Sequence, residues 1–336
     1  MRRIAVLNSY NVLPGIRGRE TKRVQNFLAA LSRNGYDEGR DYELVMLDIE
    51  ERPAMHAAVK EVVDEGVDLI HAVGTPNAFA AANATATVPI VYYGAHPEGI
   101  AHETLGADNC TGRIMALPFT ANYKNFRFVR RFLPHIRSVH AAFFADTVFV
   151  RPEMRELHDA ARARAGRRVW LSGKDDAPVG FRTLAGLGYI VGVEYKELIF
   201  SDASELEQAI EEIDPASGML MTYNELMHCP GGLETVVRKT AEMSLPMIFN
   251  NNAQVVARGL LAGIAADWAL CGTQAGETAA RILDGAAPRE IPRELHPNQV
   301  SWINVDTARR LGVELDDSLL SYFDRRVVGN VTDLCM

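Results

Sequence analysis

The residues of this sequence that could do chemistry lie in short polar turns, and each turn directly follows an apolar run. These turns occupy residues 8–11, 74–77, 94–97, 222–225 and 250–252, and they combine amides, hydroxyls and aromatic rings. Such groups can hydrogen-bond to a small molecule or stack on it. The first turn, taken alone, reads equally well as an ordinary connection between a strand and a helix.

Sequence motifs for catalysis or cofactor binding are missing from the chain. It has no GxSxG turn, no HExxH motif and no P-loop, and its nine histidines are scattered. Cys229 follows His228, but adjacency in sequence does not create a nucleophile–base pair. Gly186, Gly188 and Gly192 superficially match a dinucleotide-binding fingerprint, but strand-like rather than helical sequence follows them. We therefore expect no catalytic residue and no cofactor.

The four cysteines are not arranged as metal ligands. None of them has CxxC spacing, so we expect no structural zinc site and no other metal. Disulfides are open to them in principle, but nothing in the sequence selects partners. We expect free thiols.

A repeated alternation of strands and helices must position the polar turns. The clearest unit spans residues 68–97, where an apolar run, a polar turn, an Ala-rich segment and a second apolar run indicate a βαβ unit. Pro76 suits the first turn of its helix, where a missing N–H costs nothing. The second half repeats the pattern, with strands at 218–221 and 246–249 around a helix at 231–243. In such folds ligands bind beyond the carboxyl ends of the strands.

The remaining segments follow the same alternation. Further strands are expected at 4–7, 42–47, 111–116, 138–144, 259–264 and 299–304, and further helices at 18–32, 54–65, 121–133, 151–165, 267–283 and 306–311. Asn34 and Gly35 should end the first helix, because both tolerate a left-handed cap. Asp202 should cap another helix, with Glu205 at the capping-box position. Together these segments predict an α/β fold with parallel sheets and helices on both faces.

The length of 336 residues favours two domains. We expect crossings between two similar lobes near Leu117, near Asn250 and in the Pro-rich stretch 286–297. The N-terminal lobe would then comprise residues 1–117 plus 252–285, and the C-terminal lobe 118–251 plus 286–336. The irregular segment 170–188 has no purpose that the sequence reveals.

Composition limits the partners and the location of the protein. The formal net charge of -8 disfavours nucleic acid, which requires a basic surface. No apolar run is long enough to span a bilayer, and Met1 leads within three residues into the first expected strand without a signal peptide. Either the protein is cytoplasmic, or an export signal was removed before Met1.

Several segments together carry a resemblance to a known family. These segments are residues 34–36, 38–39, 68–70, 74–76, 80–85, 89–91, 258–259, 279–285, 303–304, 308, 311–313 and 318–320. In them the chain resembles the ABC-transporter substrate-binding proteins of the tryptophan/tyrosine-binding type, which have the type I periplasmic binding protein fold. The resemblance implies two Rossmann-like lobes joined by a hinge, closing on a small organic ligand that is amino acid-like or aromatic.

The resemblance also implies partners and site residues. It implies delivery of the ligand to the membrane permease of an ABC transporter, a periplasmic or lipid-anchored location, and a monomer without enzymatic activity. The residues that match the ligand turns of the family are Asn8, Ser9, Tyr10, Gly74, Thr75, His96, Thr222, Tyr223, Asn224, Asn250 and Asn252.

Two departures from the family pattern concern the charge of the site. Asn252 stands where the family often has an Asp that meets a ligand ammonium, and His96 replaces a neighbouring Asp position. An amide offers no opposite charge to an ammonium. We therefore expect a ligand that lacks a free α-ammonium, or whose ammonium is met elsewhere, for instance by Glu225. An alternative of nearly equal weight is that the Asn252 side chain holds its own turn through hydrogen bonds to the backbone.

Two alternative functions stay open at this point. A ligand-sensing domain of a signalling receptor would have the same fold, because the fold does not distinguish delivery from sensing. An enzyme is the less favoured alternative, and turnover of a bound ligand would indicate it.

Overall fold

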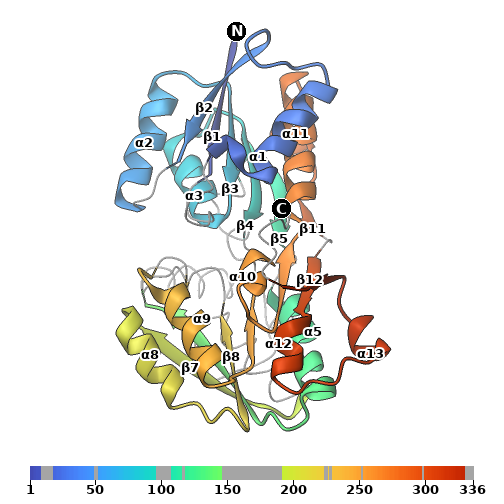
Figure 1. Ribbon diagram of the computed structural model, residues 1–336. Coiled ribbons are helices and arrows are strands. Elements are labelled where there is room, and N and C mark those ends of the chain that lie inside the picture. Colours follow the sequence, from blue (N-terminus) through green and yellow to red (C-terminus); the bar gives the residue numbers. More distant parts are fainter. Residues whose placement is uncertain are drawn as a thin grey trace. The chain divides into compact units, whose positions relative to one another are not determined.

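The computed structural model divides into two compact units, each built around its own parallel sheet (Figure 1). Unit 1 consists of Met1–Leu117, Ala266–Asn298 and Cys335–Met336, and unit 2 of Pro118–Ala265 and Gln299–Leu334. The structure describes residues 1–8, 18–48, 52–95, 107–115, 118–145, 191–222, 226, 229–250, 253–296 and 299–329. The predicted α/β fold with two parallel-sheet lobes is confirmed.

Unit 1 has a six-stranded sheet in the order β11-β5-β4-β3-β1-β2, and all its neighbouring strands are parallel. The strands are β1 (Arg2–Leu7), β2 (Tyr42–Leu47), β3 (Leu69–Val73), β4 (Ile90–Ala95), β5 (Cys110–Met115) and β11 (Glu294–His296). The helices are η1 (Gly18–Glu20), α1 (Lys22–Arg33), α2 (Arg52–Asp64), α3 (Thr75–Ala84), α11 (Trp268–Leu283) and η4 (Pro288–Glu290). Helices α1 and α11 cover one face of the sheet, and α2 and α3 cover the other (Figure 1).

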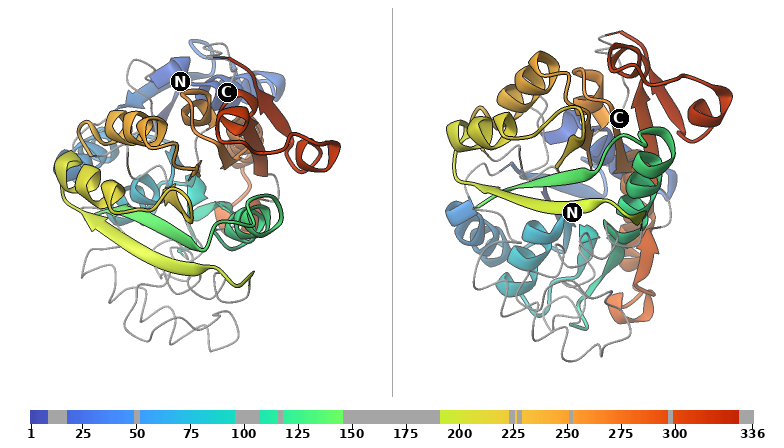
Figure 2. Two further views of the ribbon diagram at one scale, coloured as in Figure 1. Left: turned by 60° about the horizontal axis from the view of Figure 1, so that its bottom comes forward. Right: turned by 90° about the horizontal axis from the view of Figure 1, so that it is seen from below.

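Unit 2 has a seven-stranded sheet in the order β13-β12-β10-β9-β8-β6-β7. The strands are β6 (Ser138–Phe144), β7 (Glu194–Phe200), β8 (Gly218–Thr222), β9 (Met247–Phe249), β10 (Ala262–Ala266), β12 (Gln299–Asn304) and β13 (Arg325–Val327). The helices are α5 (Pro118–Phe132), α8 (Ala203–Glu211), α9 (Gly232–Glu242), α10 (Ala253–Ala257), α12 (Val305–Arg310) and α13 (Asp317–Leu320). Helices α8 and α9 lie side by side (Figure 2).

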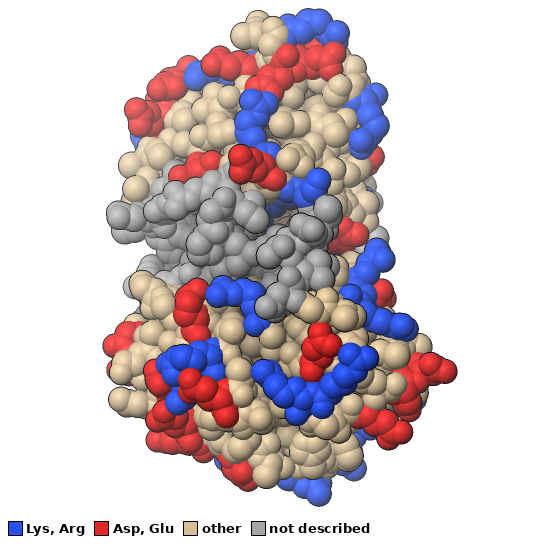
Figure 3. Space-filling view, viewed as in Figure 1, with Lys and Arg blue, Asp and Glu red and all other residues tan. Residues whose placement is uncertain are grey.

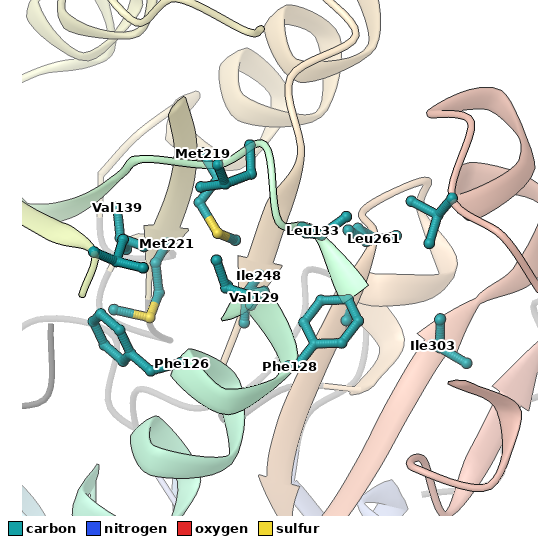
Figure 4. Packing of buried hydrophobic residues seen from close by; sticks show 14 of the residues in the cluster. Phe126, Phe128, Val129, Leu133, Val139, Met219, Met221, Ile248, Leu261 and Ile303 are labelled. Carbon is teal, nitrogen blue, oxygen red and sulfur yellow. The ribbon is translucent and has the colours of Figure 1, made fainter. Parts of the chain in front are cut away.

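The core of unit 2 forms between helix α5 and the strands beside it. Phe126 and Val129 of α5 pack against Met221 of β8 and Ile248 of β9 (Figure 4). All four residues are 1% exposed, and burying such side chains contributes about 1.5–3 kcal/mol each. The apolar face expected on this helix is therefore the face that fixes it to the sheet.

Local signals in the sequence position the helix ends as predicted. Asp202 accepts hydrogen bonds from the N–H groups of Ser204 (2.8 Å) and Glu205 (2.9 Å), so it caps α8. Glu205 accepts one from the N–H of Ser201 at 2.7 Å, which completes the capping arrangement. Helix α1 ends where Gly35 adopts φ +87°, a conformation that a residue without Cβ reaches at little cost.

The boundaries of the units differ from the expected lobe ranges in two internal segments and in the last two residues, Cys335–Met336, which belong to unit 1. Residues 253–265 belong to unit 2 rather than to the N-terminal lobe, because β10 pairs with β9 through Ala262 and Ile248. Residues 286–298 belong to unit 1 rather than to the C-terminal lobe, because β11 pairs in parallel with β5. The expected helix at 151–165 and the segment 170–188 lie outside the described residues.

Candidate functional site

Two of the predicted site residues, Asn8 and Gly74, follow neighbouring strands at the carboxyl edge of the unit 1 sheet. Strands β1 and β3 are parallel neighbours, with Leu7 opposite Ala72. Asn8 directly follows β1, and Gly74 directly follows β3. The first two polar turns of the sequence therefore start side by side at this edge.

Asn8 is a buried amide without hydrogen-bond partners. Its side chain is 1% exposed in the folded chain, and neither Oδ1 nor Nδ2 has a partner. Its backbone is anchored, since its N–H donates to the carbonyl oxygen of Leu47 at 3.3 Å. Leaving a buried polar group unpaired costs about 1–3 kcal/mol, and the great majority of such groups in folded proteins are paired. Asn8 therefore offers one acceptor and two donors to a bound molecule.

The N-terminus of helix α3 lies beside Asn8. Gly74 precedes the helix with φ +81°, and its N–H donates to the carbonyl oxygen of Tyr93 at 2.6 Å. The N-cap residue Gly74 has no side chain with which to cap α3, and Pro76 occupies the first turn of the helix, as predicted. Helix N-termini carry partial positive charge, so this end favours a negatively charged or hydrogen-bond-accepting group. For Thr75 only the backbone is described.

Asn8 belongs to the sheet face that α1 and α11 cover. Ile4 and Val6 pack in the cluster with α1 and α11, whereas Ala5 and Leu7 pack in the cluster with α2 and α3. Since side chains alternate between the faces of a strand, Asn8 continues the row of Ile4 and Val6. It therefore shares a face with the first turn of α1.

Arg23, in that first turn of α1, is a buried cation that the sequence analysis did not single out. It is 6% exposed, and its Nε and Nη2 atoms have no hydrogen-bond partner. Its guanidinium carbon lies 5.5 Å from the centre of the Trp268 ring, within range of a cation–π interaction. Burial lowers the pKa of Arg23 to about 10, so it keeps its charge at neutral pH. One signal was available: Arg23, Phe27 and Leu31 are spaced i, i+4, i+8 on the apolar stripe of α1.

His71 lies on the same face and acts as a core residue. Its ring stacks on Phe27, with ring centres 4.5 Å apart and planes 9° from parallel. Its Nδ1 lies 3.1 Å from the carbonyl oxygen of Val91. Burial lowers the pKa of His71 to about 4, so the ring is neutral at physiological pH. These contacts do not suit a general acid or base.

In unit 2, two predicted site residues end neighbouring strands. Thr222 is the last residue of β8, and its hydroxyl donates to the carbonyl oxygen of Ala142 at 2.9 Å. Asn250 follows β9, and its Oδ1 accepts a hydrogen bond from Nδ2 of Asn125 at 2.8 Å. Both residues are 1% exposed. Each side chain is therefore hydrogen-bonded within unit 2, which suits a role in holding its turn in place.

The other predicted site residues cannot be placed. They are Ser9, Tyr10, His96, Tyr223, Asn224 and Asn252, which lie outside the described residues. Their roles stay predictions.

The described part of the chain shows no feature of a metal site or a membrane span. No group of three or more His, Cys, Asp or Glu side chains in that part could hold a metal ion. Among the same residues, no helix is both long and apolar enough to cross a bilayer. Acidic and basic side chains are interspersed on the visible face of each unit (Figure 3).

Comparison with known proteins identifies the family. The family model described as ABC transporter substrate binding protein matches residues 18–166 and 171–327. The tyrosine-binding protein of Clostridioides difficile (strain R20291) is 22% identical over 298 residues, which are 87% of this chain and 77% of that protein.

Solved structures agree with this match. An ABC domain from Streptococcus pneumonia in complex with L-Trp has a TM-score of 0.74 at 17% identity, covering 97% of this chain and 99% of that one. A ligand-free, open substrate-binding protein with adhesive properties from Clostridium difficile has a TM-score of 0.67 at 18% identity, covering 98% and 100%. At 17% and 18% identity, these solved structures show only the fold. The family is shown by the family model, which matches most of the chain. The protein therefore belongs to the ABC transporter substrate-binding protein family.

Proposed function

We propose that this substrate-binding protein captures a small amino acid-like or aromatic molecule and uses Asn8 as one of its ligand-binding groups. The observation that carries the proposal is the buried Asn8 amide without partners, at the carboxyl edge of the unit 1 sheet beside the uncapped N-terminus of α3. In parallel α/β folds this edge is where ligands bind.

The ligand class is supported by the relatives. One is named for tyrosine, and another was solved with L-Trp. Tyr10 and Tyr223 are the rings that the sequence predicts for stacking on such a ligand. The remaining predicted ligand turns, including Asn252, belong to the same proposal.

The wider setting of the proposal follows the family. The protein works as a monomer outside the cytoplasm and delivers its ligand to the membrane permease of an ABC transporter. It has no enzymatic activity and closes about a hinge when the ligand binds. Small-angle scattering with saturating L-tyrosine or L-tryptophan should show compaction of a protein that starts open.

Two asparagine variants test the role of Asn8. Asn8→Ala removes an amide that makes no bond in the ligand-free protein, so we expect little loss of thermal stability. Calorimetric titration with L-tyrosine and L-tryptophan should show binding weakened about tenfold, since each lost hydrogen bond contributes about 0.5–1.5 kcal/mol.

Asn109→Ala is the matched control at the opposite edge of the same sheet. Asn109 is 8% exposed, and its Nδ2 donates to the carbonyl oxygens of Thr85 (3.1 Å) and Val88 (2.9 Å). Its loss should lower the melting temperature and leave the affinity unchanged. The proposal fails if Asn8→Ala destabilises the protein as Asn109→Ala does and binds both ligands as tightly as the wild type.

A further inference from the structure

The unpartnered donors of Arg23 form a binding fork. The N–H of Nε and one N–H of Nη2 point in parallel from one edge of a guanidinium, and this edge matches the two oxygens of a carboxylate. In Arg23 these are the two nitrogens that are buried and have no hydrogen-bond partner. An arginine that is buried only for packing gains nothing from leaving these two donors without an acceptor. The pattern therefore indicates a binding role.

The groups around Arg23 do not supply the missing acceptor. The Trp268 ring covers the guanidinium at 5.5 Å, and the buried Cys271 thiol and His71 ring lie near it on the same face. The Asp48 carboxylate raises the pKa of Arg23 through space, but Asp48 is exposed to solvent. Arg23 has no ion pair within 4.0 Å to any acidic residue in the described part of the chain.

Two polar side chains that each carry unpaired hydrogen-bonding atoms therefore share one face and one edge of the unit 1 sheet. Asn8 extends the row of Ile4 and Val6, and these two residues pack in the cluster that includes Val24, the neighbour of Arg23. Both Asn8 and Arg23 are more than nine-tenths buried. Asn8 and Arg23 do not hydrogen-bond to each other, although an amide oxygen could accept from a guanidinium.

Arg23 makes the ligand-free protein less stable than an apolar residue of similar volume would. A buried charge that lacks a hydrogen-bonded partner is unfavourable, and apolar residues of similar volume often replace such groups without loss. A ligand that brings the opposite charge would offset this cost.

We infer that Arg23 is a specificity-determining residue that binds a carboxylate of the ligand through its Nε–Nη2 edge, with the Asn8 amide beside it. The inference rests on the proposed function and adds a chemical requirement to it: the ligand must be an organic anion, and an ammonium is dispensable. The Trp268 ring lies over the guanidinium, with its centre 5.5 Å from the guanidinium carbon.

Matched probes separate the two charges of an amino acid. L-tyrosine carries both charges, hydroxyphenylpropanoate keeps only the carboxylate, and tyramine keeps only the ammonium. L-tryptophan, indolepropanoate and tryptamine form a second set. Calorimetric titration of the wild type with all six should show that each amine binds about 100-fold more weakly than its carboxylate counterpart, because two charge-assisted hydrogen bonds are lost.

Three variants test the residue itself. Arg23→Met keeps the length of the side chain and should weaken binding of the carboxylates about 100-fold while the ligand-free melting temperature stays equal or rises. Arg23→Lys keeps the charge without the fork and should weaken binding by a smaller factor. Arg33→Met is the control on the exposed end of the same helix and should leave binding unchanged.

The outcomes distinguish the inference from the proposed function. If the wild type binds tyramine and tryptamine as tightly as the carboxylates, the inference is overturned and the proposed function stands. The inference is also overturned if Arg23→Met keeps its affinity for carboxylates, or if its melting temperature falls by several degrees as for a structural contact. If the wild type binds none of the six probes, the proposed function itself is contradicted along with the inference.

Discussion

Replacing Gly272 by alanine tests how α1 and α11 pack in unit 1. A Cβ at Gly272 would lie 2.0 Å from the carbonyl oxygen of Arg23, whereas ordinary contacts begin at 3.4 Å. A Cβ at Gly276, one turn later, would lie 2.5 Å from the carbonyl oxygen of Phe27. Both obstacles are backbone atoms of a regular helix, so no side-chain rotation relieves the clash.

The magnitude follows from two opposing terms. Overpacking of a tight contact costs about 1–3 kcal/mol, and a shift of a whole helix by about 1 Å belongs at the upper end. The higher helix propensity of alanine offsets about 1 kcal/mol. We therefore expect Gly272→Ala to lower the free energy of unfolding by about 2 kcal/mol. The shift would also move Arg23 away from Trp268, so binding of aromatic carboxylates should weaken.

Urea unfolding followed by far-UV circular dichroism measures the change. Glu277→Ala is the control, because it introduces the same residue on the exposed side of α11 and should change the free energy of unfolding by less than about 0.5 kcal/mol. A Gly272→Ala protein that is as stable as the wild type, with the same dependence on urea, would refute the packing described for these helices.

Two further predictions concern buried titratable groups. The pKa of His71 is about 4 in the folded chain against an ordinary value of 6.5, so the unfolded chain binds a proton first as the pH falls. Stability should therefore drop between pH 6.5 and pH 4 by up to about 3 kcal/mol, and His71→Phe should flatten this dependence in pH-resolved thermal denaturation; an unchanged slope would contradict it. Cys110, Cys229 and Cys271 are buried thiols that form no disulfide, and burial raises the pKa of Cys110 to about 11. A thiol reagent should therefore modify at most one of the four cysteines before unfolding, and rapid modification of two or more would exclude this burial.

Much of the fold was predictable because its signals are local. The strand at 138–144 matches β6, and the βαβ unit with Pro76 matches β3, α3 and β4. Caps and turns depend on residues close together in sequence, as the hydrogen bond from the N–H of Glu205 to the Asp202 carboxylate shows. The run 259–264 was harder to place, because it is apolar throughout and lacks a period. The strand begins only at Ala262, after a turn in which Gly259 has φ +109°.

Assignment of segments to sheets was not predictable from local pattern. An apolar strand such as β10 has the same composition whichever sheet it joins, and only its pairing with β9 decides. The same limit applies to the site. Asn8 and Gly74 follow strands that the sequence reveals, whereas the importance of Arg23 depends on α11, which covers it from a remote part of the chain.

The packing of α1 against α11 has a consequence for synthesis of the protein. The Asn26 amide donates to the carbonyl oxygen of Ala269 at 3.1 Å across 243 residues of sequence. At a translation rate of about 5–20 residues per second, α1 waits roughly 10–50 s for its partner helix to leave the ribosome. During that interval Val24 and Phe27, both fully buried in the folded chain, lack the cover that α11 gives them. Unit 1 therefore cannot complete its fold until residues 266–298 have been made, and the apolar face of α1 stays uncovered until then.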